Sequence, residues 1–186
     1  MPYIETIQHE DAEGALKEIY DNLVKTRGKV AEVHKIQSLN PESIVNHMDL
    51  YMTIMFGQSP LKRVHREMMA VIVSISNNCE YCQVHHLEAV QNFWKDEDKL
   101  NQLQRDFESA DLSEKEKALC RFAKALTESP EKSEDAGLVR PLQKGGFSDR
   151  EILDATLVIA YFNFVNRIVL SLGVSLEENP GGYKYD

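Results

Sequence analysis

Hydrophobic residues recur along most of this chain at intervals of three and four positions, the spacing that gathers them on one face of an α-helix. No stretch alternates apolar and polar residues with a period of two over the length of a strand. We therefore predict an all-α fold that is essentially free of β-sheet. Clusters of Gly, Pro, Asn and Ser separate the helical patterns and set the expected helix boundaries.

Two capping boxes support these boundaries, because Ser113 precedes Glu116 and Ser148 precedes Glu151 at the spacing that satisfies free amide groups at a helix start. Ser59-Pro60 is a third start signal, and Pro141 is expected to bend or break its helix. The predicted helices cover approximately residues 11–28, 30–39, 41–56, 60–77, 80–94, 96–107, 113–128, 133–144 and 149–172.

The 186 residues fit one domain. We expect an N-terminal helical arm over about 1–57, a core over about 58–174, and a Gly-rich polar tail over 175–186 that crosses the surface or a subunit interface. The last helix is apolar over most of its surface, which argues for a central position. Polar residues interrupt its apolar pattern, so we expect it to fall short of a membrane span; they are Asp154, Asn163, Asn166 and Arg167.

Composition excludes some functions. Thirty acidic residues face 21 basic ones, a formal net charge of -9, which makes nucleic acid an unsuitable partner. Three cysteines do not make a disulfide framework. No apolar segment follows Met1, so we expect no signal peptide. Together these features predict a protein of the reducing cytoplasm.

The candidate chemistry is concentrated in one stretch, EMMAVIVSISNNCEYCQVHH, from Glu67 to His86. Asn77-Asn78 breaks one helix and Cys79 begins the next, which places Cys79 near the N-cap and Cys82 in the first turn. Free amide groups there favour a thiolate. His86 follows Cys82 by four residues and lies one turn further on the same face, where a neutral imidazole could take the thiol proton.

Glu67 supplies a carboxylate to the same stretch. It shares the apolar face of its helix with Val64 and Val71, so we expect it to be buried. A buried carboxylate needs a partner or its pKa rises, and such a group is a candidate proton shuttle. Thiolate, imidazole and carboxylate would then act as nucleophile, base and orienter.

Other interpretations compete with this one. The cysteines could be core packing, as we expect of Cys120. They could hold structural zinc with His85 or His86, although the sequence offers no clear fourth ligand. They could form a thioredoxin-like site, although that motif belongs in a βαβ pattern and the surroundings here are helical.

The pattern Glu67, Cys79, Cys82 and His86, with the wording NNCEYCQVHH, resembles the alkylhydroperoxidase D-like core of the carboxymuconolactone decarboxylase superfamily. The segment from Tyr161 to Glu177 is similar to the C-terminal signature of its peroxidase-related subgroup. The resemblance implies an all-α alkylhydroperoxidase D-like fold, a trimeric or hexameric homo-oligomer, and thiol-dependent peroxide reduction without a cofactor or a metal.

Carried over position by position, the resemblance makes Cys82 the peroxide-attacking cysteine and Cys79 the resolving cysteine that closes a disulfide with it. Glu67 and His86 match the proton relay. This chain has Tyr81 where the best-studied peroxidases of the family have a histidine, and a phenol does not titrate near neutral pH. The relay is therefore expected to be weaker or differently arranged.

Secondary candidates for the site are Tyr81, His85, Asn166 and Arg167. The leading hypothesis is a thiol peroxidase that takes a small hydroperoxide and an external dithiol or thiol protein as reductant. A second hypothesis is a disulfide oxidoreductase or redox sensor without physiological peroxidase activity. A third, of another class, is a structural helical assembly protein with a metal at Cys79, Cys82 and His86. Decarboxylation, also found in the superfamily, is not marked by the cysteine pair.

Overall fold

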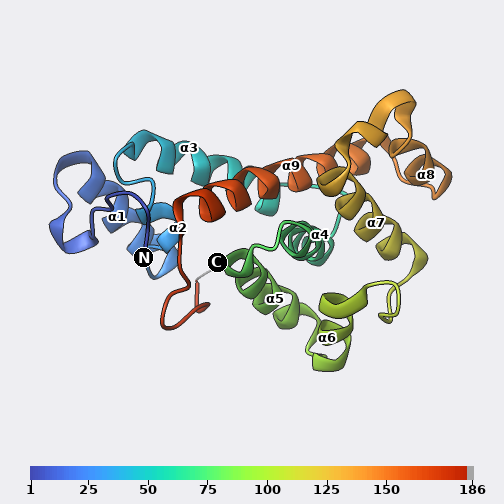
Figure 1. Ribbon diagram of the computed structural model, residues 1–186, viewed down its shortest axis with the longest axis horizontal. Helices are drawn as coiled ribbons and strands as arrows, with labels where there is room; N and C mark the ends of the chain where they lie inside the picture. Colours follow the sequence, from blue (N-terminus) through green and yellow to red (C-terminus); the bar gives the residue numbers. More distant parts are fainter. Residues whose placement is uncertain (184–186) are drawn as a thin grey trace. The chain divides into compact units, whose positions relative to one another are not determined.

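The computed structural model describes residues 1–183, and the prediction of an all-α protein is confirmed: these residues form helices joined by turns, with no strand (Figure 1). Two compact units divide the chain. One comprises residues 1–53 with 167–186, and the other comprises 54–166. The division expected near residue 57 thus falls at 53/54. The C-terminal part of the last helix groups with the N-terminal segment, whereas we had placed it in the core up to 174.

The first unit is built from short helices: η1 (His9–Asp11), α1 (Gly14–Arg27), α2 (Glu32–Lys35) and α3 (Pro41–Tyr51). Its core gathers apolar side chains of α1 and α3 around Tyr20, which is fully buried. Gly28 ends α1 in the left-handed conformation, with φ 89°, as the sequence predicted. The helix predicted over 30–39 is shorter, because residues 36–40 continue as turns held by i to i+3 backbone bonds. The predicted tail is described to residue 183, and its last three residues lie outside the described part.

After α3 the chain winds into a π-helical turn, η2 (Met52–Phe56), and passes into the second unit within this turn. That unit contains α4 (Arg63–Ser76), α5 (Glu80–Trp94), α6 (Glu97–Asp106), α7 (Glu114–Glu128), η3 (Pro130–Ala136), α8 (Val139–Lys144) and the first part of α9 (Asp149–Leu172). Helix α4 is its centre. Every residue from Arg66 to Ser74 is buried, and α4 packs against α5, α6 and α7 (Figure 1).

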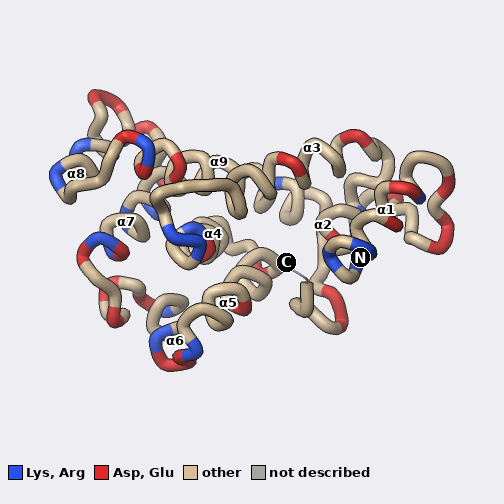
Figure 2. Tube along the Cα trace, turned by 180° about the vertical axis from the view of Figure 1, so that it is seen from behind, with Lys and Arg blue, Asp and Glu red and all other residues tan. Residues whose placement is uncertain are grey.

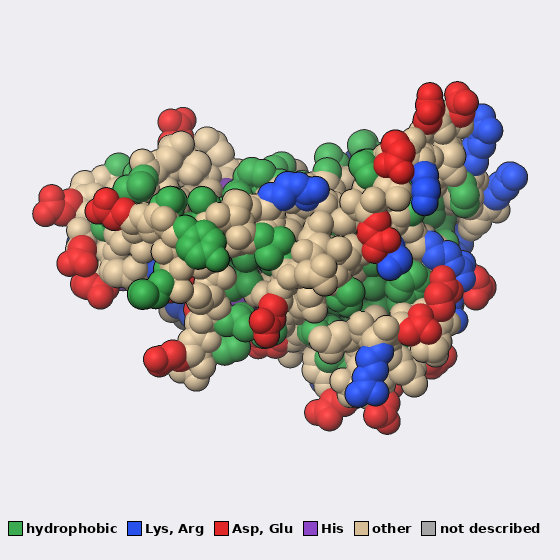
Figure 3. All heavy atoms as spheres, in the orientation of Figure 1, with side chains coloured by type: hydrophobic (Ala, Val, Ile, Leu, Met, Phe, Trp, Pro, Cys, Tyr) green, Lys and Arg blue, Asp and Glu red, His purple; other side chains and the backbone are tan. Residues whose placement is uncertain are grey.

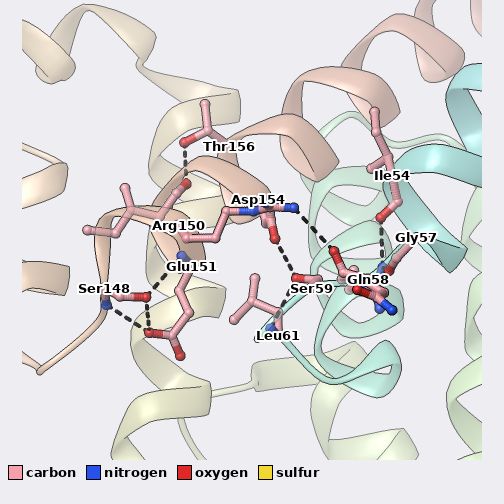
Figure 4. Close-up of polar contacts among 12 residues, drawn as sticks. Ile54, Gly57, Gln58, Ser59, Leu61, Ser148, Arg150, Glu151, Asp154 and Thr156 are labelled. Atoms are coloured by element: carbon pink, nitrogen blue, oxygen red, sulfur yellow. Dashed lines mark hydrogen bonds and ion pairs between the residues drawn. The ribbon is translucent and has the colours of Figure 1, made fainter.

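Two predicted boundaries in this unit are wrong. Helix α4 begins at Arg63 instead of Pro60, because Ser59 is used otherwise: its hydroxyl donates to Asp154 at 2.5 Å and accepts from the amide of Leu61 at 3.1 Å (Figure 4). The helix predicted over 133–144 breaks at Asp135, with φ 51°. Pro141 is the third residue of α8 and does not break it. In the first turn of a helix the backbone N–H has no intrahelical acceptor, so a proline there removes no hydrogen bond.

Both predicted capping boxes are confirmed. The Ser113 hydroxyl accepts from the amide of Glu116, and the Glu116 carboxylate accepts from the amide of Ser113. Ser148 and Glu151 make the same reciprocal pair at the start of α9 (Figure 4).

Helix α9 corrects the expectation that it falls short of a membrane span. By length and composition alone it could cross a membrane, with 24 residues and a mean hydropathy of 1.5 in its most apolar window. Its interrupting polar residues bond within the protein, however: Asp154 to Ser59, Asn163 to Thr127, and Asn166 to Ser74. A core helix of a soluble protein passes the same test.

Acidic and basic side chains are interspersed over α6, α7 and α8 on the face shown in Figure 3. Pairs such as Arg121 with Glu108, at 2.6 Å, neutralise one another there. This face therefore offers no broad basic surface of the kind that binds nucleic acid.

Candidate active site

The loop that presents the cysteines forms as predicted. Helix α4 ends at Ser76, Asn78 adopts a left-handed conformation with φ 54°, and Cys79 is the N-cap of α5. Asparagine tolerates that conformation better than most residues. The amide of Cys79 bonds back to the carbonyl of Ser74 at 2.8 Å, so the loop is fastened to the last turn of α4.

Cys79 and Cys82 are free thiols that lie together in the interior, with exposed fractions of 0% and 2%. The thiol of Cys82 hydrogen-bonds to the sulfur of Cys79, and its backbone amide does the same. These bonds outweigh burial and lower the pKa of Cys79. The same sulfur contact, with burial, raises the pKa of Cys82 well above its usual value. Of the two cysteines, Cys79 therefore gives up its proton more readily, because the Cys82 thiol and amide donate to its sulfur.

Asn166 reaches this pair from α9. Its side chain is fully buried and hydrogen-bonds to Cys82, which favours the thiolate form of that cysteine and partly opposes the effect of Cys79. It also donates to Ser74 at 3.3 Å and accepts from Asn77 at 3.0 Å. The secondary candidate Asn166 is thus brought to the cysteines, whereas Arg167 lies on the exposed side of α9.

Glu67 and His86 meet across α4 and α5, with His86 Nδ1 2.6 Å from Glu67 Oε2. The carboxylate is fully buried, and burial alone would raise its pKa. The attraction of His86 and then of Arg63 outweighs burial and lowers it. An ionised Glu67 accepts a proton-bearing Nδ1, which leaves Nε2 as the basic nitrogen of a neutral His86. Phe162 packs edge-on against the imidazole, with ring centroids 4.4 Å apart.

Arg63 is a site residue that our sequence analysis missed. Its Nε donates to Glu67 Oε1 at 2.7 Å, and its Nη2 bonds to the same oxygen. The guanidinium lies over the ring of Phe56, 3.5 Å from the centroid. Figure 2 shows the Lys and Arg positions gathered at the start of α4, next to an acidic one. The spacing of four residues between Arg63 and Glu67 is a known helical ion-pair signal and could have identified the partner.

Tyr81 and His85 contact one another on α5, close in sequence to the cysteines. Tyr81 is buried, and its ring contacts that of His85 edge-on with centroids 4.6 Å apart. Their roles remain predictions. Cys120 is fully buried in α7, and burial raises its pKa strongly, in agreement with a packing role.

The zinc alternative loses its geometric basis. Within residues 1–183, no three side chains of His, Cys, Asp or Glu converge closely enough to hold a metal ion. The imidazole of His86 points toward Glu67, and its Nδ1 bonds to the Glu67 carboxylate. Cys79, Cys82 and His86 do not form a metal-binding set in this arrangement.

The second unit thus carries a buried cysteine pair and a buried histidine–carboxylate pair on two helices that pack together. Residues 46–125 match the Carboxymuconolactone decarboxylase family. A search of curated proteins gives no match.

Solved structures cover nearly the whole chain. An uncharacterized peroxidase-related protein from Silicibacter sp. TM1040 is 27% identical over 96% of this chain and 91% of its own, with a TM-score of 0.81. An uncharacterized peroxidase-related protein from Ralstonia eutropha JMP134, described as an alkylhydroperoxidase AhpD core, is 20% identical over 95% and 93%, with a TM-score of 0.83. The debrominase Bmp8 is 21% identical over 95% and 92%, with a TM-score of 0.77. At their identities the last two show a shared fold alone.

The family match over residues 46–125 and the structural likeness support the resemblance to the alkylhydroperoxidase D-like core of the carboxymuconolactone decarboxylase superfamily that the motif suggested.

Proposed function

We propose that this protein is a thiol peroxidase that reduces a small hydroperoxide through Cys79 and Cys82. The observation that supports this most strongly is the pair itself. Two buried thiols hydrogen-bond to one another at the start of α5, and His86 on the same helix bonds to the carboxylate of Glu67. Such a pair can supply two electrons and receive the protons that move with them.

In the first step the Cys82 thiolate attacks the distal oxygen of the hydroperoxide. The S–O bond forms as the O–O bond breaks, so Cys82 becomes a sulfenic acid and the substrate leaves as an alcohol after taking a proton. Cys79 can accept the Cys82 proton beforehand through the bond they share. His86 Nε2, directly or through a water, is the group suited to hold and return a proton at the substrate oxygen.

In the second step the Cys79 sulfur attacks the sulfenic sulfur of Cys82. A disulfide forms and water leaves, so two thiols and one hydroperoxide become one disulfide, one alcohol and one water. An external dithiol or thiol protein then reduces the disulfide. The contact between the two sulfurs supports this step, because it requires little movement of the first turn of α5.

The near-complete burial of both sulfurs favours a small oxidant over a protein disulfide. A different observation favours the second candidate, a disulfide oxidoreductase. The cysteine with the lowered pKa is Cys79, the first of the motif, as is usual for redox Cys-x-x-Cys sites. The two candidates differ in which sulfur attacks, so single-cysteine variants separate them.

The remaining expectations form part of the same proposal. The protein would act in a reducing compartment such as the cytoplasm, as a trimeric or hexameric homo-oligomer, without a nucleic-acid or membrane partner. The exposed apolar side chains of α9 in the second unit, Leu153, Leu157 and Phe164, suit burial against another subunit.

A thiol count on the reduced protein, before and after one equivalent of an organic hydroperoxide, tests the proposal. We expect the wild type to lose two thiols rapidly, Cys82→Ser to lose none, and Cys79→Ser to stop at a sulfenic acid that a dimedone probe traps. Cys120→Ala is the matched control and should behave as wild type. A sulfenic acid trapped in Cys82→Ser would exchange the two roles. A wild-type protein that ignores peroxide but exchanges readily with a disulfide reagent would establish the oxidoreductase instead.

A further inference from the structure

Arg63 makes contacts that a surface arginine would not need. It approaches Glu67 with two nitrogens, Nε and Nη2, on the single oxygen Oε1, and leaves Oε2 to His86. The ring of Phe56 closes its other side. An arginine that lies between an aromatic face and a carboxylate has little freedom to move, so its charge is fixed beside Glu67.

The loop that carries Phe56 is itself fastened to α4. Arg66, the neighbouring arginine, is buried and donates from Nη1 to the carbonyls of Ile54 and Gly57 at 2.9 and 3.1 Å. These bonds close the end of the π-helical turn η2 over the start of α4. Arg66 therefore hydrogen-bonds to backbone carbonyls of the loop, whereas Arg63 hydrogen-bonds to the carboxylate of Glu67.

Charge balance shows why the carboxylate needs this partner. To accept a proton, His86 must be neutral, and at that moment it no longer compensates the buried charge of Glu67. The charged groups that act on Glu67 are His86 on α5 and Arg63 and Arg66 on α4. The neighbours from α9 are the uncharged Phe162 at His86 and Asn166 at the cysteines. Arg63 is the second cation bonded to Glu67, and its charge does not depend on the protonation state of His86.

Without that cation, Glu67 and His86 would behave as a closed pair that holds one proton. A buried carboxylate with no other partner keeps the imidazole protonated, or takes the proton itself when the imidazole gives it up. In the first case His86 has no basic nitrogen, and in the second Glu67 no longer carries the charge that orients the ring. With Arg63 present, Glu67 stays ionised and orients the imidazole of His86 while Nε2 takes up and releases its proton.

We propose that Arg63 is a positioning residue that keeps Glu67 as the carboxylate partner of His86 Nδ1, and so leaves His86 Nε2 able to take up and release a proton. The role in turnover rests on the proposed peroxidase or thiol-exchange function. The effect on His86 does not, since it concerns the reduced protein without substrate.

The test is an NMR titration of the His86 ring nitrogens in the reduced protein. In Arg63→Met the imidazolium should persist to higher pH, with the midpoint of the titration raised by about one unit, because the second cation bonded to Glu67 no longer disfavours a positive charge on His86. Arg63→Lys should restore the midpoint to within a few tenths of a unit of the wild type, because the charge is kept. If Arg63→Met does not fold, Arg63→Gln makes the same test, since it keeps a hydrogen-bond donor without the charge.

Arg150→Met is the matched control. Arg150 also pairs with an acid four residues on, Asp154, at 2.8 Å, and it donates to the carbonyl of Gln58 (Figure 4). It does not contact His86, so its loss should leave the His86 titration unchanged. Equal midpoints in wild type and Arg63→Met, or a failure of Arg63→Lys to restore the shift, would overturn the proposal.

A second readout links this role to turnover. The pH profile of thiol loss with organic hydroperoxide should move its acidic limb upward in Arg63→Met by the same amount as the titration. If the wild type consumes no peroxide, the proposed function fails while the titration still decides the role of Arg63. If the titration shifts and the limb does not, His86 is not the base in the rate-limiting step, and the part of the proposal that concerns turnover fails.

Discussion

Two histidines of the N-terminal unit should make its stability depend on pH. His34 on α2 and His47 on α3 lie with ring centroids 5.6 Å apart. His34 Nδ1 is buried and has no hydrogen-bond partner among the described residues, and His47 Nδ1 bonds with the side chain of Gln37 at 2.8 Å. Burial, then the neighbouring His47 and Arg27, lower the pKa of His34 to about 3, and burial lowers the pKa of His47 to about 4.

The sign follows from proton binding. The ordinary histidine pKa is 6.5, so between pH 6.5 and these lowered values the unfolded chain binds more protons than the folded one. The stability from neutral burial is complete above pH 6.5 and is lost as the pH falls. Each group changes the unfolding free energy by about 1.4 kcal/mol per pH unit. Between pH 7.5 and pH 5, His34 and His47 should remove about 2 kcal/mol each, or about 4 kcal/mol together.

Amide hydrogen exchange of α1 and α3 measures the opening free energy of this unit directly. The double variant His34→Phe, His47→Asn keeps a ring at the first site and an acceptor near Nδ1 at the second, and it should lose most of the pH dependence over this range. Ile44→Val, at a fully buried α3 position, is the control: it should lower stability by about 1 kcal/mol and leave the slope unchanged. A double variant with the slope of the wild type would refute the reasoning.

Three further predictions concern single positions. Glu67→Gln should slow thiol oxidation by organic hydroperoxide about 10²-fold in stopped-flow measurements, because the base loses its orienting charge, while both thiols remain countable. Asn166→Ala should slow the same step and lower the unfolding free energy by about 1–3 kcal/mol in urea titrations, because Ser74 and Asn77 lose a buried partner; unchanged stability would contradict the network. Gly28→Ala should lower the unfolding free energy by about 1 kcal/mol, since φ is 89° there, and a calorimetric scan without a shift in Tm would contradict it.

Local signals in the sequence were sufficient for the cysteine loop. Asn77-Asn78 ended one helix, and α5 runs from Glu80 to Trp94 as predicted, with Cys79 at its N-cap. The periodicity of α4 placed Glu67 in the interior, where it is fully buried. These features depend on residues close to one another in the chain, and the physics of helix caps and helix faces acts over that range.

Other local sequence signals gave wrong predictions where a residue distant in the chain formed a hydrogen bond with the side chain concerned. Ser59-Pro60 has the form of a helix start, but the Ser59 hydroxyl donates to Asp154, 95 positions away, and α4 begins three residues later. Polar residues of α9 suggested that it falls short of a membrane span. They are instead satisfied by partners inside the fold, which lets an apolar helix carry them.

The sequence by itself determined the helical class and the position of the cysteine pair at a helix start. It also determined that Glu67 lies on the apolar face of its helix and that His86 shares a helix face with Cys82. Only the tertiary structure decided how these groups are paired. It brought Glu67 to His86, placed Asn166 of α9 against Cys82, and set Arg63 between Phe56 and the carboxylate. Helix caps and periodicity arise from interactions within a few residues, whereas the choice of a partner for a buried charge depends on which helices pack together. That choice also decides which cysteine of the pair gives up its proton more readily, because a pKa in the interior is set by the neighbours that packing supplies.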